Sequence, residues 1–195
     1  MNDRAIEQSR LVVISGPSGS GKTTVCNRLI EDPNIVMSVS ATTRPPRPGE
    51  KDGVNYYFLS PDEFRGWIEQ GLFLEHAEYN GDLYGTPRSQ LEEKLAAGAT
   101  VLLEIDVQGA RQLRENCPDA LYIFLDAPNR DEGVRRLTRR NTETPEQVRR
   151  RLEAARRELE QTDLFDHKVV NDDLDETVGR IRELIREARR ADTST

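Results

Sequence analysis

The feature that most constrains this 195-residue chain is a glycine-rich segment, GPSGSGKTT at Gly16–Thr24. It follows a short apolar run, LVVIS at Leu11–Ser15, that predicts a buried strand, and it precedes residues with helical spacing. In this setting, the pattern of glycine, four residues, glycine, lysine and threonine is typical of a phosphate-binding loop (P-loop), because glycines let several backbone N–H groups point at phosphate oxygens. Lys22 would add a charge at the β- and γ-phosphates, and Thr23 would offer its hydroxyl to Mg²⁺. The segment therefore predicts a site for a nucleoside triphosphate with Mg²⁺.

A mainly parallel sheet is indicated by two further apolar runs, Thr100–Asp106 and Ala120–Asp126. Runs that are apolar at nearly every position are typical of strands buried on both faces of a parallel sheet. Because strands alternate with helical segments, we expect an α/β fold of the three-layer P-loop type. Shorter runs predict strands at Val36–Ser40, Asn55–Ser60, Leu72–Tyr79 and His167–Asn171, and Asn80–Gly85 has the composition of a turn.

Capping residues mark where helices begin. In the SPDE segment (Ser60–Glu63), a capping serine, a proline and a glutamate three residues after the cap predict a helix that Gly71 ends. Its apolar side chains, Phe64, Trp67 and Ile68, would face a core. Two more helices are expected, one from Thr86 to near Gly98 and an amphipathic one over Val178–Ala188.

Two segments differ from this α/β core. Residues 39–90 are rich in proline, glycine and tyrosine, and residues 131–160 read as helical and dense with charge. We expect both as lobes over the carboxyl edge of the sheet, where such sheets bind ligands. They would interrupt one domain at 9–190, whose core is 9–38, 91–130 and 161–190, between flexible termini at 1–8 and 191–195.

The composition excludes several classes of protein. A net charge of -7 argues against a general nucleic-acid binder, and no apolar run approaches the length of a membrane span. The first ten residues contain no apolar signal core, and Cys26 and Cys117 have no metal-type spacing, so both are expected as reduced structural thiols. We therefore expect a cytoplasmic protein without nucleic-acid or membrane partners.

The P-loop leaves open where the phosphoryl group goes. A switch GTPase would carry an NKxD segment to read guanine, but Arg130 stands in place of that lysine within Asn129–Glu132, and a large ATPase motor would need a longer chain. A small acceptor would need a second anion site. Arg44 and Arg47, held apart by two prolines, are candidates, because a stiff backbone loses less entropy when guanidinium groups grip a phosphate.

An acceptor site also needs further donors and a group that selects the base. Tyr56 and Tyr84 could donate phenolic hydrogens to the same anion. A fixed carboxylate favours guanine, which presents two adjacent N–H donors, over adenine, and Glu75 is our candidate for it. Taken singly, each residue also fits a plain structural interpretation: solvated arginines, packed tyrosines and an ordinary exposed strand acid.

Taken together, five segments resemble guanylate kinases over about Leu11 to Ile185: GPSGSGKTT, SVSATTRPPRPGEKDGVNYYF, FLEHAEYNGDLYGTP, LLEIDVQGA and KVVNDDLD. The P-loop is shared by many families, whereas TTRPPRPGE and YGTP are much more specific. The resemblance implies a nucleoside-monophosphate kinase of purine metabolism, which makes GDP and ADP from GMP and ATP with Mg²⁺. It also implies a GMP-binding lobe near 39–90 and a helical lid near 131–160.

The resemblance assigns expected roles to individual residues. The GMP site would comprise Ser40, Arg44, Arg47, Tyr56 and Tyr84 at the phosphate, with Glu75, Thr86 and Asp106 at the guanine. The ATP site would comprise Gly16, Pro17, Ser18, Gly19, Ser20, Gly21, Lys22, Thr23, Thr24 and, near the adenine, Asn171. The expected catalytic set is Lys22 and Arg44 with three lid arginines, Arg136, Arg140 and Arg151.

The chain departs from the family pattern at three positions. Glu104 stands where the family usually has aspartate near the Mg²⁺ region, and Arg139 and Asn141 stand where the lid often has glycine. Three rival functions stay open: a scaffold domain without catalysis, a kinase for a phosphorylated sugar, and a kinase for another nucleoside monophosphate. A monomer and a homo-oligomer are both compatible with the sequence.

Overall fold

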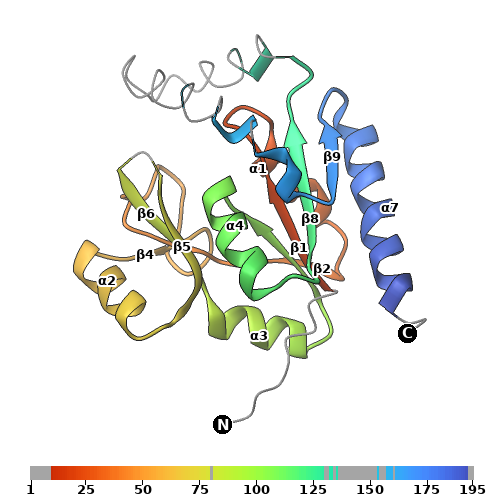
Figure 1. Cartoon of the computed structure of the whole chain (residues 1–195). Helices are drawn as coiled ribbons and strands as arrows, with labels where there is room; N and C mark the ends of the chain where they lie inside the picture. The colour runs from red at the N-terminus through yellow and green to blue at the C-terminus, as the bar shows by residue number, and fades with distance from the viewer. Residues whose placement is uncertain are drawn as a thin grey trace.

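The computed structural model contains a parallel five-stranded sheet with the order β2-β7-β1-β8-β9 (Figure 1). The structure describes residues 10–79, 81–129, 132–133, 135, 153, 157–159 and 161–192. The strands of this first sheet are β1 (Leu11–Ser15), β2 (Ile35–Met37), β7 (Thr100–Glu104), β8 (Leu121–Asp126) and β9 (His167–Val170).

Helices cover both faces of the first sheet and create two apolar cores. α1 (Lys22–Leu29) and α7 (Leu174–Asp192) pack on one face, against Val12 and Ile14 of β1. α3 (Arg88–Ala96) and α4 (Val107–Asn116) pack on the other face, against Leu11 and Val13. Successive side chains of β1 point to opposite faces of the sheet. Because helices cover both faces, every residue of β1 is buried. The predicted three-layer α/β fold is confirmed.

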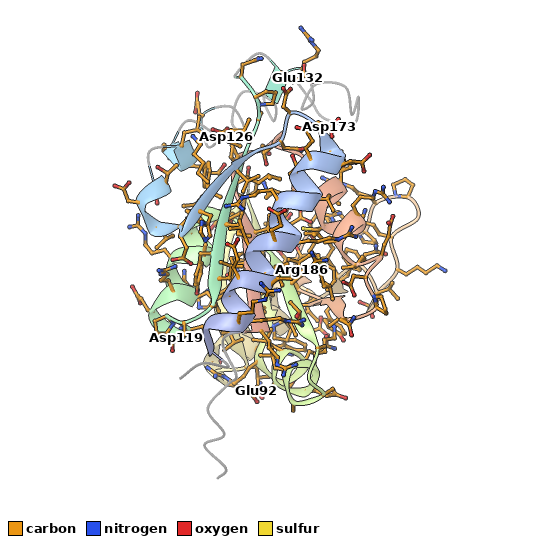
Figure 2. The ribbon with its side chains drawn as sticks, turned by 90° about the vertical axis from the view of Figure 1, so that its right-hand side faces the viewer. Glu92, Asp119, Asp126, Glu132, Asp173 and Arg186 are labelled. Carbon is orange, nitrogen blue, oxygen red and sulfur yellow. The ribbon has the colours of Figure 1, made fainter. Side chains whose placement is uncertain are left out.

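The carboxyl edge of the first sheet gathers the loops that follow its parallel strands. Ser15 pairs with Phe124, and Ile14 pairs with Glu104, so β1, β7 and β8 end at nearly the same level. Figure 2 shows this polarity: Asp126, at the end of β8, lies toward one pole of the molecule, and Asp119, just before β8, lies toward the opposite pole. The P-loop and the residues after β7 therefore share one edge.

A second, smaller sheet stands apart from the first, with the order β4-β3-β6-β5 (Figure 1). Its small core joins Phe64 of α2 (Pro61–Glu69) to Phe73, with ring centroids 4.5 Å apart, and Trp67 and Ile68 pack against them. The capping box predicted for this helix is present, since Ser60 accepts from Glu63 N and Glu63 accepts from Ser60 N. The strands are β3 (Ala41–Thr42), β4 (Tyr57–Phe58), β5 (Phe73–Tyr79) and β6 (Asp82–Pro87).

Several sequence predictions are wrong in detail. Asn80–Gly85 was expected as a turn, but most of it belongs to β6, whose antiparallel pairing with β5 overrides the turn-like composition. The strand expected at Val36–Ser40 ends at Met37, because the chain leaves the first sheet there and enters the second at Ala41. α4 was not predicted, and α7 begins four residues before the expected helix.

The two cysteines, Cys26 and Cys117, are free and buried, in agreement with the expectation of structural thiols. No helix in the described part of the chain is both long and apolar enough to span a bilayer. The helical lid expected over residues 131–160 lies almost wholly outside the described residues. The division into core, lobe and lid stays a prediction.

Candidate active site

A cavity of about 720 Å³ lies where the P-loop, the second sheet and the carboxyl end of β7 meet. Its walls bring together residues that are far apart in the sequence, including Lys22, Arg44 and Glu75. Thirteen of the residues predicted for the site line it: Gly16, Ser18, Gly19, Gly21, Lys22, Thr23, Ser40, Arg44, Arg47, Tyr56, Glu75, Tyr84 and Asp106.

The P-loop is held tightly by its neighbours. At Gly16 the φ angle is 139°, and a β-carbon there would collide with the carbonyl of Leu125 in β8, so this position needs glycine. Lys22 Nζ donates to the carbonyl oxygens of Gly16 and Pro17, at 2.5 and 3.2 Å. The lysine is therefore folded back over its own loop, within reach of any phosphate that the loop would hold.

Asn171, the residue that follows β9, supports the P-loop. Its side-chain amide Nδ2 donates to the backbone carbonyl of Ser20 at 2.8 Å, and both residues are buried. Its own backbone N–H donates to the carbonyl of Asp126 at 2.8 Å. Asn171 thus links the loop to the end of β8, whereas its predicted role near the adenine stays a prediction. Pro17, Ser20 and Thr24 belong to the loop but do not line the cavity.

Thr23 and Glu104 form a pair of oxygens at the floor of the cavity. Thr23 Oγ1 donates to Glu104 Oε1 at 2.7 Å, and Glu104 is the last residue of β7. Glu104, one of the three positions at which the chain departs from the family pattern, therefore directly contacts the threonine predicted to meet Mg²⁺.

Arg44 is already paired in this structure. Its two terminal nitrogens donate to the two carboxylate oxygens of Glu50, each at 3.0 Å, and one also donates to the carbonyl of Pro45. The guanidinium carbon lies 5.4 Å from the ring centroid of Tyr56. Burial alone would raise the pKa of Glu50, but the hydrogen bonds from Arg44 and from the backbone of Arg47 bring this pKa below its usual value.

Glu50 was missed from the sequence, although it lies in the recognised TTRPPRPGE segment. The signal available was its place three residues after Arg47, whose N–H donates to Glu50 at 2.6 Å. Arg47 itself is exposed, and Tyr56 and Tyr84 contact each other edge-on at 6.2 Å between ring centroids. Arg44, Arg47 and both tyrosines therefore surround one corner of the cavity, as expected for an anion subsite.

Glu75 is only 4% exposed, so the alternative interpretation as an exposed strand acid is wrong. Its Oε1 accepts a 2.6 Å hydrogen bond from Thr86 Oγ1, on the paired position of β6. Burial raises the pKa of Glu75 to about 7; the hydrogen bond from Thr86 opposes this shift, and the charge of Asp106 adds to it. A buried carboxylate on a cavity wall is suited to reading adjacent N–H donors.

Asp106 lies beside Glu75 at the start of α4. Its carboxylate caps this helix by accepting from Gly109 N at 2.8 Å. Burial raises the pKa of Asp106, and the backbone hydrogen bonds from Gly109 and Gln108 oppose the rise. Asp106 is thus both a structural cap and a wall residue of the cavity.

Tyr79 was also missed. Its hydroxyl lies 3.3 Å from Ser18 Oγ, so β5 of the second sheet contacts the P-loop directly. No local motif marked this tyrosine, because the contact exists only when the two sheets face each other. The lid arginines Arg136, Arg140 and Arg151 lie outside the described residues, so their predicted roles stay predictions.

A P-loop that faces a second, arginine-bearing subsite within a parallel α/β fold defines a phosphotransferase of the P-loop class. The guanylate kinase family model matches residues 8–188. The chain therefore belongs to the guanylate kinase family.

Individual relatives agree with this assignment. The chain is 49% identical to a guanylate kinase of Rubrobacter xylanophilus over 93% of this chain and 95% of the relative. It is 52% identical to a guanylate kinase of Frankia casuarinae over 88% and 94%, respectively. The solved guanylate kinase from Anaplasma phagocytophilum superposes with a TM-score of 0.74 at 38% identity, covering 91% of this chain and 84% of that one.

Proposed function

We propose that the chain transfers the γ-phosphoryl group of ATP to GMP, giving ADP and GDP. The observation that carries this proposal is the single cavity that joins the P-loop, the Arg44 corner and buried Glu75. A scaffold domain would not need Lys22 and Thr23 on the cavity wall, and a sugar-phosphate kinase would not need a buried carboxylate for a base.

The acceptor phosphate would occupy the corner that Arg44 and Arg47 share with Tyr56 and Tyr84, with Ser40 completing the wall. Arg44 is presented in a fixed orientation, because Glu50 and Pro45 hold its guanidinium. A guanidinium group that is already held in place loses less side-chain entropy when it binds a phosphate.

The guanine would lie against Glu75 and Asp106. Thr86 is fully buried and does not line the cavity, so its part would be to orient the Glu75 carboxylate through the hydrogen bond that it donates. The N1–H and N2–H groups of guanine would meet the carboxylates on the cavity wall, whereas adenine would leave the Glu75 carboxylate badly paired.

ATP would bind with its phosphates in the P-loop and with Lys22 beside the β- and γ-phosphates, while Asn171 keeps the loop in shape. Thr23 and Glu104 fit a magnesium ion, because they place two hard oxygen atoms 2.7 Å apart at the cavity floor. Among the described residues, no group of three or more histidines, cysteines or acids could hold a metal ion by itself, so the remaining ligands would be water and phosphate oxygens. Bound Mg²⁺ would supply charge neutralisation at these phosphates.

Transfer itself would need positioning and charge stabilisation rather than a covalent enzyme intermediate. The acceptor is already an anionic oxygen, so we assign no general base. Lys22, Arg44 and the lid arginines Arg136, Arg140 and Arg151 would offset charge on the transferring group, and closure over the cavity would exclude water. We place the reaction in the cytoplasm, where buried free thiols stay reduced.

The proposal is tested by an ADP-release assay with ATP and Mg²⁺ across GMP, AMP, CMP, UMP and ribose phosphates. We expect GMP to be the preferred acceptor, with little ADP release when no acceptor is present. A rate with GMP that does not exceed the background would overturn the proposal, and a preference for a ribose phosphate would favour the sugar-phosphate alternative.

A further inference from the structure

Gly109, in the first turn of α4, lies directly beneath the carboxylate of Glu75. A β-carbon built on Gly109 would overlap Glu75 Oε2, and it would lie 3.1 Å from Glu75 Cδ and 3.6 Å from Ile105 Cβ. Gly109 and Glu75 are both buried. The space that a side chain at 109 would need is therefore the space that the carboxylate fills.

The backbone of α4 does not itself require a glycine here. Gly109 lies inside the helix and outside the positive-φ region, so an L-residue could adopt its conformation. Glycine is a poor helix former compared with alanine, so its presence weakens the helix. The helix geometry does not explain the glycine at position 109, whereas the contact with Glu75 does.

Two other helical glycines have room for a β-carbon, unlike Gly109. At Gly66 in α2, the nearest atom to a built β-carbon is Gln70 Nε2 at 3.9 Å, and at Gly179 in α7 nothing lies within 4 Å. Of these three glycines, only Gly109 faces a buried ionisable group. Gly179 therefore serves as a matched control for the helical effect of the substitution.

The carboxylate cannot simply move aside. Its other oxygen is bound to Thr86, which is fully buried, and Thr86 is fixed opposite Glu75 in the β5–β6 pair. The turn beneath it is also fixed, because Gly109 N donates to the capping carboxylate of Asp106. An added methyl group at 109 would therefore push the carboxylate toward the cavity.

We propose that Gly109 is a positioning residue that sets the depth and orientation of the Glu75 carboxylate, and so the preference for a base with two adjacent N–H donors. This inference rests on the proposed function, because it deepens the role of the same site. Gly109 acts through Glu75 and need not touch the substrate.

The test compares Gly109→Ala with Gly179→Ala in the full chain. For Gly109→Ala we expect KM for GMP to rise tenfold or more, kcat at saturating GMP to stay within a few-fold, and KM for ATP to be unchanged. The ratio of kcat/KM for GMP over AMP should fall in parallel. Gly179→Ala should leave all of these constants at their original values.

A rescue variant separates this contact from general damage. Glu75→Asp shortens the side chain by one methylene, so the double variant Glu75→Asp/Gly109→Ala should bind GMP more tightly than Gly109→Ala alone, as measured by calorimetry. If Gly109→Ala does not fold, Glu75→Ala/Gly109→Ala should still fold and melt no lower than Glu75→Ala.

The possible outcomes are distinct. An unchanged KM for GMP in Gly109→Ala, equal losses for GMP and ATP, or a double variant that melts well below Glu75→Ala would each overturn the positioning role. An original chain that phosphorylates no GMP would instead overturn the proposed function, while the melting comparison would still report on the contact between Gly109 and Glu75.

Discussion

Arg44 and Glu50 form a two-point ion pair in which both terminal nitrogens of the guanidinium meet the carboxylate at 3.0 Å. The pair is poorly exposed, with 11% and 18% of the two side chains accessible. The proposed anion subsite therefore contains a carboxylate that neutralises Arg44 and fixes the orientation of its guanidinium group.

For GMP binding, the two-pronged shape of the Arg44 guanidinium group should contribute more than its positive charge. Arg44→Lys keeps the positive charge, but one ammonium group cannot hold Glu50 at two points and also contact a phosphate. Loss of one charge-assisted hydrogen bond, at about 1.5–3 kcal/mol, predicts a rise of roughly tenfold to hundredfold in KM for GMP. Steady-state kinetics would measure it, with Arg47→Lys as the exposed comparison. A larger rise in KM for GMP in Arg47→Lys than in Arg44→Lys would contradict this prediction.

Lys22 should be needed for catalysis and not for folding. Its ammonium contacts only carbonyl oxygens of the P-loop in the described contacts, at Gly16 and Pro17. We expect Lys22→Ala to lower kcat by roughly 10²-fold or more, the scale seen when a group that stabilises transition-state charge is removed. Thermal melting should change little. Undiminished turnover would rule out the P-loop mechanism.

Binding of GMP should tighten as the pH rises through 7. The pKa of Glu75 is about 7 because of burial, and a base with two N–H donors needs the ionised carboxylate. The bound state therefore releases a proton, and Kd for GMP should fall from pH 6.5 to pH 8. A phosphate monoester ionises near pH 6, so Glu75→Gln is the control that isolates that contribution. An equal pH dependence in both proteins would contradict this role for Glu75.

The same carboxyl group should make the ligand-free fold less stable at higher pH. Its folded pKa of about 7 exceeds the unfolded value near 4.5, so the folded state binds the extra proton between these values. The contribution of Glu75 to the free energy of unfolding is complete below about pH 4.5. It declines as the pH rises to 7, by up to roughly 3 kcal/mol. Denaturant unfolding of Glu75→Gln should lack this decline, and parallel curves for both proteins would refute it.

The contact between Tyr79 and Ser18 should couple the two subsites. Tyr79→Phe keeps the ring and removes the hydroxyl that lies 3.3 Å from Ser18 Oγ. A hydrogen bond of this kind contributes about 1 kcal/mol, so we expect KM for ATP and for GMP to rise together by about fivefold. A change in only one of the two constants would show that the contact does not link them.

The sequence predicted what local patterns specify. The P-loop strand, the capping box at Ser60 and the buried runs of β7 and β8 follow from residue spacing, and the structure contains them. β6 was missed because its residues favour a turn in isolation, and only pairing with β5 makes them a strand. α4 was missed because its start is defined by the cap at Asp106, only two residues after the end of β7.

The environment of the site residues was less predictable than their identity. Glu75 was found as an acid in a strand, but its burial depends on Thr86 from the next strand and on Gly109 from α4. Glu50 and Tyr79 become recognisable only once their partners, Arg44 and Ser18, are in place. Contacts of this kind depend on tertiary packing, which residue spacing does not encode.

The second sheet is inserted between β2 and β7, and these two strands are neighbours in the first sheet, with Val36 paired to Val101. The chain therefore leaves the first sheet after Met37 and returns to the neighbouring parallel strand at Thr100, by way of α3. A different inserted part would have to keep the contacts that join it to the core, between Tyr79 and Ser18 and between Glu75 and Gly109. Donor and acceptor subsites in this chain therefore meet through side-chain contacts, whereas the strands that carry them pair within separate sheets.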